Sequence, residues 1–187
     1  ITGGCGGTQS KQQAVTVTAP PSAGTLSGTQ AICMGGSTTF SSSVSGGTWS
    51  SNSAAATINP TSGAISGVSA GTATMTYTVA GTGGCANATD MRTVTVTTPP
   101  NAGTLSGTQT VCVNATTTFS STQSGGTWSS DNTSVATVVA GTGVVTGVAG
   151  GSATIAYTVP GTGGCSNAKA TRLVTVTPLA SIASVSG

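Results

Sequence analysis

The feature that most constrains this chain is an internal repeat that covers nearly all of its 187 residues. The run that begins at Pro20-Pro21 returns at Pro99-Pro100, 79 residues later, and Tyr77 returns as Tyr157, 80 residues later. About three of every five aligned positions are identical. Solenoid repeats are typically ~20–50 residues long, so a unit of this length is a whole small domain. The sequence therefore predicts two domains in tandem.

The repeat also predicts where the domains begin and end. We assign residues 19–97 to the first copy and residues 98–177 to the second. Residues 1–18 resemble the end of a copy, because Val15-Thr16-Val17-Thr18 matches Val94-Thr95-Val96-Thr97. We interpret them as the C-terminal strand of a preceding repeat. Residues 178–187 lie where a following repeat or a linker is expected.

Short apolar runs, separated by Gly, Ser, Asn or Pro, recur every 8–12 residues in each copy, which is typical of a β-sandwich. The clearest run places Ala73, Met75, Tyr77 and Val79 on one face and threonines on the other. We therefore predict an all-β fold with seven to eight short strands per copy. In the first copy the expected strands are Gly24–Ser27, Gln30–Cys33, Thr38–Ser42, Gly47–Ser51, Ala55–Asn59, Ala64–Gly67, Thr72–Val79 and Arg92–Thr97.

Aromatic residues are scarce, with one Phe, one Trp and one Tyr in each copy. A Trp on a strand could fill the core or offer a stacking surface to sugars. A sugar platform usually needs several aromatic rings on one face, and a small sandwich needs a large central side chain, so the core position is favoured. The predicted core residues are Phe40, Trp49, Tyr77, Phe119, Trp128 and Tyr157.

Three segments of the second copy, starting at Trp128-Ser129-Ser130, Val135-Ala136-Thr137-Val138 and Gly143-Val144-Val145-Thr146-Gly147-Val148, carry a family resemblance. In this order they resemble the bacterial Ig-like domain of group 2. The resemblance covers almost all of both copies and implies immunoglobulin-like sandwiches of the kind strung along bacterial surface adhesins and large secreted proteins. The cysteines are not part of the family's common pattern.

Five cysteines leave one without a partner, and each copy carries two of them. We favour bonds within each domain, Cys33 with Cys85 and Cys112 with Cys165. The alternative is a ladder that joins neighbouring domains through Cys5–Cys33 and Cys85–Cys112. With the favoured pairing, Cys5 would bond to a preceding repeat or to another subunit. Such bonds predict an oxidising, extracellular location, on the bacterial cell surface or beyond it.

Catalytic and cofactor chemistry are disfavoured by the residue types present. The chain has no His, and its only acids, Asp90 and Asp131, lie at non-equivalent places in different copies, so paired carboxylate catalysis is excluded within one domain. Without His or a CxxC pair we expect no metal site and no cofactor. Four scattered basic residues form no patch for nucleic acid. Glycines interrupt the long uncharged stretch, so we expect no membrane insertion.

A surface with so little charge needs another source of solubility. Asn87, Asn114 and Asn132 each begin an Asn-x-Ser/Thr acceptor pattern for covalent glycans. Packing against neighbouring copies of the chain is the other way to cover such a surface.

Repetition without a recognisable site predicts a structural role. We expect a repeat unit of an extracellular filament or surface stalk, with neighbouring copies or repeats of itself as partners. The alternative is an adhesin module that binds a glycan or a protein receptor through loops at one end of the sandwich.

Overall fold

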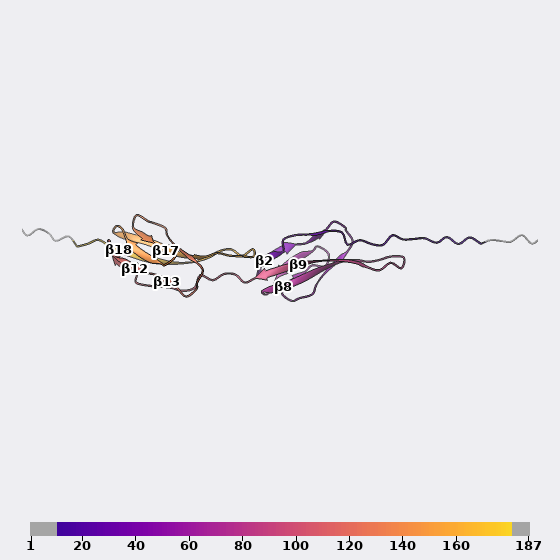
Figure 1. Cartoon of the computed structure of the whole chain (residues 1–187), viewed down its shortest axis with the longest axis horizontal. Coiled ribbons are helices and arrows are strands. Elements are labelled where there is room, and N and C mark those ends of the chain that lie inside the picture. The colour runs from indigo at the N-terminus through magenta and orange to yellow at the C-terminus, as the bar shows by residue number, and fades with distance from the viewer. Residues whose placement is uncertain (1–10, 181–187) are drawn as a thin grey trace, which may run out of the picture.

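The computed structural model describes residues 11–180, and it contains two sandwiches that lie end to end (Figure 1). We call them unit 1 and unit 2. Unit 1 contains β1 (Leu26–Ser27), β2 (Ala31–Cys33), β3 (Ser37–Thr39), β4 (Ser41–Ser42), β5 (Thr48–Ser51), β6 (Ala56–Ile58), β7 (Ala64–Gly67), β8 (Gly71–Val79) and β9 (Ala88–Thr97). Unit 2 contains β10 (Leu105–Ser106), β11 (Thr110–Cys112), β12 (Thr116–Thr118), β13 (Ser120–Ser121), β14 (Thr127–Ser130), β15 (Ala136–Val138), β16 (Val144–Gly147), β17 (Gly151–Val159) and β18 (Ala168–Thr177).

Both units have the same topology. In unit 1 a four-stranded sheet, β2-β9-β8-β5, packs against a three-stranded sheet, β3-β7-β6, and a short β1-β4 pair completes the sandwich. In unit 2 the corresponding sheets are β11-β18-β17-β14, β12-β16-β15 and β10-β13. All pairings are antiparallel except β2 with β9 and β11 with β18. The predicted all-β immunoglobulin-like class is confirmed.

The alternation of apolar and polar residues determines which face of each strand is buried. On β8, Ala73, Met75 and Tyr77 are buried, while the threonines between them are half-buried. Val94 and Val96 of β9 point into the same core. Burying such side chains contributes ~1.5–3 kcal/mol each relative to leaving them in water. Each unit has its own core cluster, so the two sandwiches do not share one hydrophobic interior.

The predicted core aromatics of both units lie inside these clusters. Phe40 and Phe119 have no exposed surface, and Trp49 and Trp128 are 6% and 7% exposed. In unit 1 the ring centroids of Trp49 and Tyr77 are 4.7 Å apart, and unit 2 repeats this distance. The Tyr77 hydroxyl donates a hydrogen bond to the Val44 carbonyl and accepts one from the Gly47 amide, each 2.8 Å long.

Each unit has two distinct ends. In the register of the four-stranded sheet, Cys33 on β2 lies beside Thr97, the last residue of β9. We call this the tail end, and in unit 2 it is marked by Cys112 beside Thr177. The opposite end carries the loop between β8 and β9, residues 80–87, and between β17 and β18, residues 160–167. We call this the loop end.

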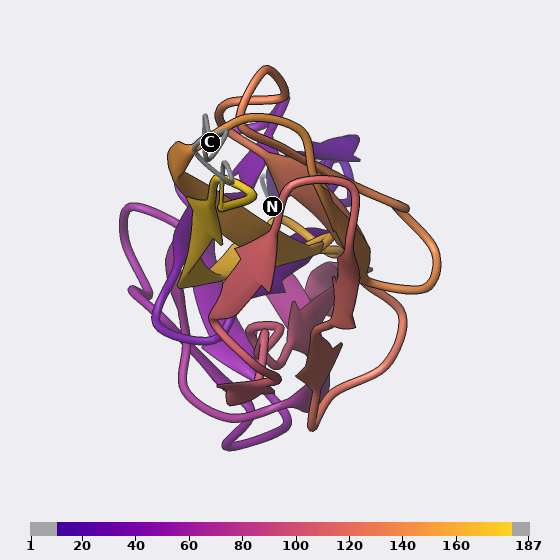
Figure 2. The ribbon, with the colours of Figure 1, turned by 90° about the vertical axis from the view of Figure 1, so that its left-hand side faces the viewer.

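Unit 2 follows unit 1 with its loop end facing the tail end of unit 1. Residues 98–104 link β9 to β10. Ala102 of this linker is 4% exposed within the core of unit 2, and its carbonyl accepts a 2.7 Å hydrogen bond from the Ser121 hydroxyl. Figure 2 looks along the long axis from the side of unit 2, and the two units largely overlap in projection.

Candidate functional site

The junction between the units is the most distinctive site in the described part of the chain. The loop at residues 160–167 is shaped by its own hydrogen bonds, since the Gly161 amide donates to the Asn167 side-chain oxygen at 2.9 Å and the Cys165 amide donates to the Thr162 carbonyl at 3.0 Å. Gly163 and Gly164 have φ angles of 59° and 83°, a left-handed conformation that glycine adopts without strain. The Gly-Thr-Gly-Gly-Cys sequence therefore folds into a tight loop that presents Cys165.

This loop packs directly on the tail end of unit 1. A Cβ atom placed on Gly164 would lie 3.2 Å from the Ala31 carbonyl oxygen and 3.3 Å from the Ile32 Cα atom. The Sγ atom of Cys165 lies 3.5 Å from the Thr97 carbonyl oxygen. A Cβ atom at these distances would be crowded against strand β2, so the glycine allows the two units to approach closely without displacing either backbone.

A disulfide bond between Cys33 and Cys165 closes the junction. Their Cα atoms are 4.7 Å apart, although 132 positions separate them in sequence. The bond joins β2 of unit 1 to the loop of unit 2, so the two units are connected covalently at two places, through the linker and through this bond.

The favoured prediction of a bond between Cys33 and Cys85 is wrong, and so is the corresponding bond between Cys112 and Cys165. Cys33 lies at the tail end of unit 1, and Cys85 lies at its loop end. The length of β9, about 30 Å at ~3.3 Å per residue, separates them. A disulfide requires Cα atoms within about 7 Å. Both cysteine pairs that we expected within one domain are therefore at opposite ends of the same sandwich.

The alternative prediction, a ladder of bonds between neighbouring domains, also names the wrong cysteine pairs. It correctly placed bonds between neighbouring domains, but it paired Cys5 with Cys33 and Cys85 with Cys112. Within residues 11–180, Cys85 and Cys112 are free thiols, at the loop end of unit 1 and the tail end of unit 2. These are the two far ends of the pair of units, which excludes their direct contact. Cys5 lies outside the described residues.

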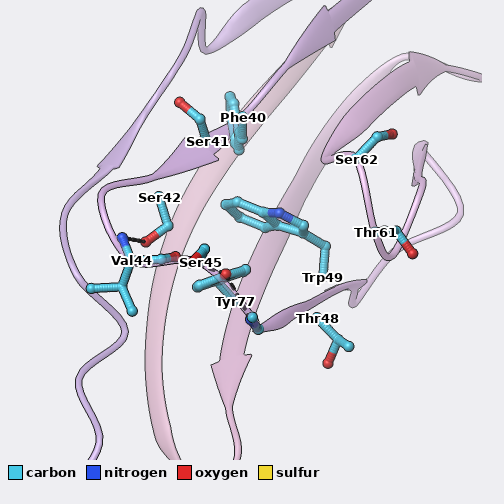
Figure 3. A pocket seen from close by; sticks show the side chains of 12 residues that line it. Phe40, Ser41, Ser42, Val44, Ser45, Thr48, Trp49, Thr61, Ser62 and Tyr77 are labelled. Atoms are coloured by element: carbon cyan, nitrogen blue, oxygen red, sulfur yellow. Dashed lines mark hydrogen bonds between the residues drawn. The ribbon is translucent and has the colours of Figure 1, made fainter.

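A hollow of about 470 Å³ opens beside the aromatic core at the loop end of unit 1 (Figure 3). Trp49 and Tyr77 form its floor, and serines and threonines form much of its rim. Trp49 and Tyr77 are 6% and 4% exposed, so neither ring offers an open face to a sugar. The hollow is a surface depression over the core, with no cluster of charged groups in it.

Residues 91–170 match the family model of the bacterial Ig-like domain, group 2. This segment is a member of that family. The match to the bacterial Ig-like domain begins within β9 and ends within β18, so it covers most of unit 2. Unit 1 has the same topology and is identical to unit 2 at about three of every five aligned positions.

Solved structures similar to this chain include parts of an S-layer protein and of intimin. Domains 4 and 5 of the S-layer protein SbsC are 19% identical over 81% of this chain and 97% of that chain, with a TM-score of 0.36. The C-terminal 282-residue fragment of intimin, solved in complex with the intimin-binding domain of the translocated intimin receptor, is 17% identical over 81% of this chain and 63% of that chain, with a TM-score of 0.49. No curated protein sequence matches the chain significantly.

Sequence reasoning missed one important pair of residues in these Ig-like units. The guanidinium group of Arg92 donates hydrogen bonds to the carbonyl oxygens of Leu26 and Gly28, at distances from 2.7 to 3.2 Å, and lies 5.4 Å from the centre of the Phe40 ring. Arg172 repeats these contacts in unit 2. A signal was available, because these arginines are the only charged residues that occur at equivalent positions in both copies.

The two acids of the chain, Asp90 and Asp131, lie in different units, and each accepts a hydrogen bond from a backbone amide. The Asp131 carboxylate accepts a 2.7 Å hydrogen bond from the Thr154 amide, and this bond lowers the pKa of the carboxyl group below its usual value. Asn52 does the same in unit 1, where its side-chain oxygen accepts a 2.8 Å hydrogen bond from the Thr74 amide. The role is structural, since a neutral amide accepts the equivalent hydrogen bond in unit 1. No group of three or more potential metal-ligating residues occurs among residues 11–180.

The three asparagines of the glycan acceptor pattern are exposed in the structure. Asn87 also has a structural role, because its side-chain oxygen accepts a 3.0 Å hydrogen bond from the Gly81 amide and so shapes the loop end of unit 1. Asn132 accepts a 2.6 Å hydrogen bond from the Ser134 hydroxyl, and Asn114 adopts a positive φ of 67°. Glycosylation of the three residues stays a prediction.

Proposed function

We propose that this chain is a mechanical spacer, a structural repeat segment of an extracellular filament or surface stalk. The observation that carries the proposal is the Cys33–Cys165 bond, which joins successive Ig-like units at the place where a flexible chain of domains would bend. With the short linker anchored in the core of unit 2, the bond fixes the second unit on the first. A rod made in this way holds whatever it carries at a defined distance.

The setting implied by this bond supports an extracellular location. Structural disulfides persist in oxidising environments such as the cell exterior. No helix among residues 11–180 is long and apolar enough to cross a membrane.

The adhesin alternative finds less support in the geometry. It needs free loops at one end of the sandwich, and the loop end of unit 2 is in contact with unit 1. The corresponding loop of unit 1 has almost the same sequence, so it is better explained as a second contact surface of the same kind than as a dedicated receptor site. Binding of the isolated chain to a glycan array would favour the adhesin.

Pulling on the two ends of a single molecule tests the spacer proposal directly. Force passes from one end to Cys33, across the disulfide to Cys165, and on to the other end. The 132 positions between the two cysteines therefore carry no force while the disulfide bond is intact. At ~3.3–3.6 Å per residue they correspond to about 450 Å of hidden chain. We expect the oxidised chain to extend less than the reduced chain by this amount.

The matched control is the double variant Cys85→Ser/Cys112→Ser, which keeps the junction bond and should behave like the wild type. The double variant Cys33→Ser/Cys165→Ser should extend fully without any reductant. Equal extension of the wild type before and after reduction would contradict the proposal, because the junction would then carry no load.

A further inference from the structure

The two free cysteines reproduce the two halves of the junction. Cys85 occupies the position in unit 1 that Cys165 occupies in unit 2, and Cys112 occupies the position in unit 2 that Cys33 occupies in unit 1. The Cys85 loop has the same internal hydrogen bonds, from the Gly81 amide to Asn87 at 3.0 Å and from the Cys85 amide to the Thr82 carbonyl at 3.2 Å. The Cys85 loop therefore has the same local structure as the loop that contacts a tail end in the junction.

The segment before unit 1 already reproduces one part of that contact. Thr18, which corresponds to Thr97 in sequence, places its carbonyl oxygen 3.6 Å from the Cys85 Sγ atom, as Thr97 does at 3.5 Å from Cys165. A Cβ atom on Gly83 would meet Thr18, just as one on Gly163 would meet Thr97. The loop end of unit 1 thus holds Thr18 in the place that Thr97 occupies in the junction.

The contact with a β2 strand distinguishes the two loops. A Cβ atom on Gly164 would meet strand β2 of unit 1, whereas one on Gly84 would have no heavy atom within 4 Å among the described residues. Gly84 has the same left-handed conformation, with φ of 86° against 83°. The loop of unit 1 thus has the backbone conformation of the bonded loop and leaves the place of a β2 strand open among the described residues.

The tail end of unit 2 presents the matching surface. Cys112 is exposed at the end of β11, beside Thr177 in the register of the sheet. The Val113 amide donates to the Thr177 carbonyl at 3.0 Å, as the Met34 amide donates to the Thr97 carbonyl at 2.8 Å. The strand that receives Cys165 in the junction therefore has a close counterpart here.

We propose that Cys112 of one copy of this chain bonds to Cys85 of a second copy, so that the copies join head to tail through the same junction that Cys33 and Cys165 form. This inference deepens the proposed function and rests on it. In the new junction, Thr177 of the first copy takes the place of Thr18 of the second. Residues 11–19 are exposed and form no strand, so their displacement breaks no sheet.

The chemistry of the bond is a thiol–disulfide exchange with a small-molecule disulfide of the glutathione type. The Cys112 thiolate attacks the small disulfide, releases one small thiol and forms a mixed disulfide. The Cys85 thiolate then attacks the Cys112 sulfur and releases the second small thiol. The two protein thiols are oxidised, and one small disulfide is reduced to two thiols.

A mixing experiment with two single variants tests the direction of this bond. Both are made in a chain with Cys5→Ser, which removes the remaining thiol, and incubated with oxidised and reduced glutathione. The parent chain should form a series of multimers on a non-reducing gel. Cys85→Ser alone and Cys112→Ser alone should stay monomeric. Their equimolar mixture should stop at the dimer, and mass spectrometry should find one peptide pair besides that of Cys33 and Cys165, with Cys112 bonded to Cys85.

Symmetric dimers of either single variant, or a monomeric parent chain, would overturn the inference. Circular dichroism of each variant and detection of the Cys33–Cys165 peptide pair establish that the units and their junction are intact. The pulling experiment on the monomeric Cys85→Ser/Cys112→Ser variant tests the spacer proposal separately. If the parent chain stays monomeric but its oxidised form still extends less than its reduced form, head-to-tail joining is rejected and the spacer role is retained.

Discussion

Two loops of this molecule have nearly the same sequence and the same backbone, yet one is bonded and the other is free. The loop at residues 160–167 lies against unit 1 and is closed by a disulfide, while the loop at residues 80–87 keeps a free thiol. The difference arises from the neighbour and not from the loop, because only the loop at residues 160–167 has a described tail end beside it. Whether the loop cysteine of a unit is bonded therefore depends on the tail end that lies beside it.

Removing the junction bond should have the largest effect on this comparison, since it makes the two loops alike. In the chain-entropy model a bond that closes a loop of 132 positions stabilises the folded state by about 5 kcal/mol. We expect Cys33→Ser/Cys165→Ser to lower the free energy of unfolding by this amount in urea titrations. Cys85→Ser/Cys112→Ser is the matched control and should leave it unchanged. Equal stability of the two double variants would show that the junction bond does not constrain the unfolded chain.

Much of each sandwich is predictable from local sequence, and the junction is not. Alternation along β8 identifies its buried face, and glycines and asparagines mark the turns around it. Cysteine pairing depends instead on which end of the sandwich each residue reaches. That is decided by the parallel register of β2 with β9, a pairing between segments more than 60 positions apart. Patterns within one segment carry no information about such a register. The sequence alone therefore could not show that the two cysteines of each domain lie at opposite ends of the sandwich.

Arg92 and Arg172, each bonded to two backbone carbonyls and lying over a Phe ring of its own unit, form what we call the Arg clamp. The clamp tests a feature that the two units share. Replacing Arg92 by Met leaves the carbonyls of Leu26 and Gly28 without their charged donor and removes the contact with Phe40. We expect a loss of about 3 kcal/mol in the stability of unit 1. Arg172→Met should cost unit 2 a similar amount, as measured by urea unfolding monitored through the Trp fluorescence of each unit.

Lys169→Met is the control for the clamp, because Lys169 is an exposed cation on β18 that makes no hydrogen bond with its side chain among the described residues. It should change stability by less than ~0.5 kcal/mol. A loss equal to that of Arg172→Met would mean that net charge, and not the clamp, sets the stability of unit 2.

Gly84 and Gly164 allow the two loops to be compared, because they differ in what an added Cβ atom would contact. Gly84→Ala and Gly164→Ala both force alanine into a left-handed conformation, which costs about 1 kcal/mol. Only Gly164→Ala also pushes a methyl group against the backbone of β2, at 3.2 Å from the Ala31 carbonyl oxygen. We expect this variant to lose about 1 kcal/mol more in thermal or urea unfolding. Equal losses would indicate that the loop moves away from β2 without cost.

The smallest expected effect concerns Asp131 and its counterpart Asn52. The hydrogen bond from the Thr154 amide lowers the pKa of Asp131 from its usual value of 3.8. A carboxyl group whose pKa is lower in the folded state stabilises the fold above its unfolded pKa, and this contribution disappears as the pH falls through the folded pKa. Unit 2 should therefore lose some stability below about pH 4, whereas unit 1, with a neutral Asn52, should not lose it for this reason.

Exchanging the two residues tests this assignment. Asp131→Asn should remove the acid sensitivity from unit 2, and Asn52→Asp should introduce it into unit 1, because both side chains accept the same backbone hydrogen bond. Melting temperatures measured between pH 5 and pH 2 would reveal the exchange. The effect is small because Asp131 is exposed to solvent, where water competes with the Thr154 amide for the carboxylate. Acid sensitivity that stays in unit 2 after Asp131→Asn would contradict this assignment, since the variant has no acidic side chain left in that unit.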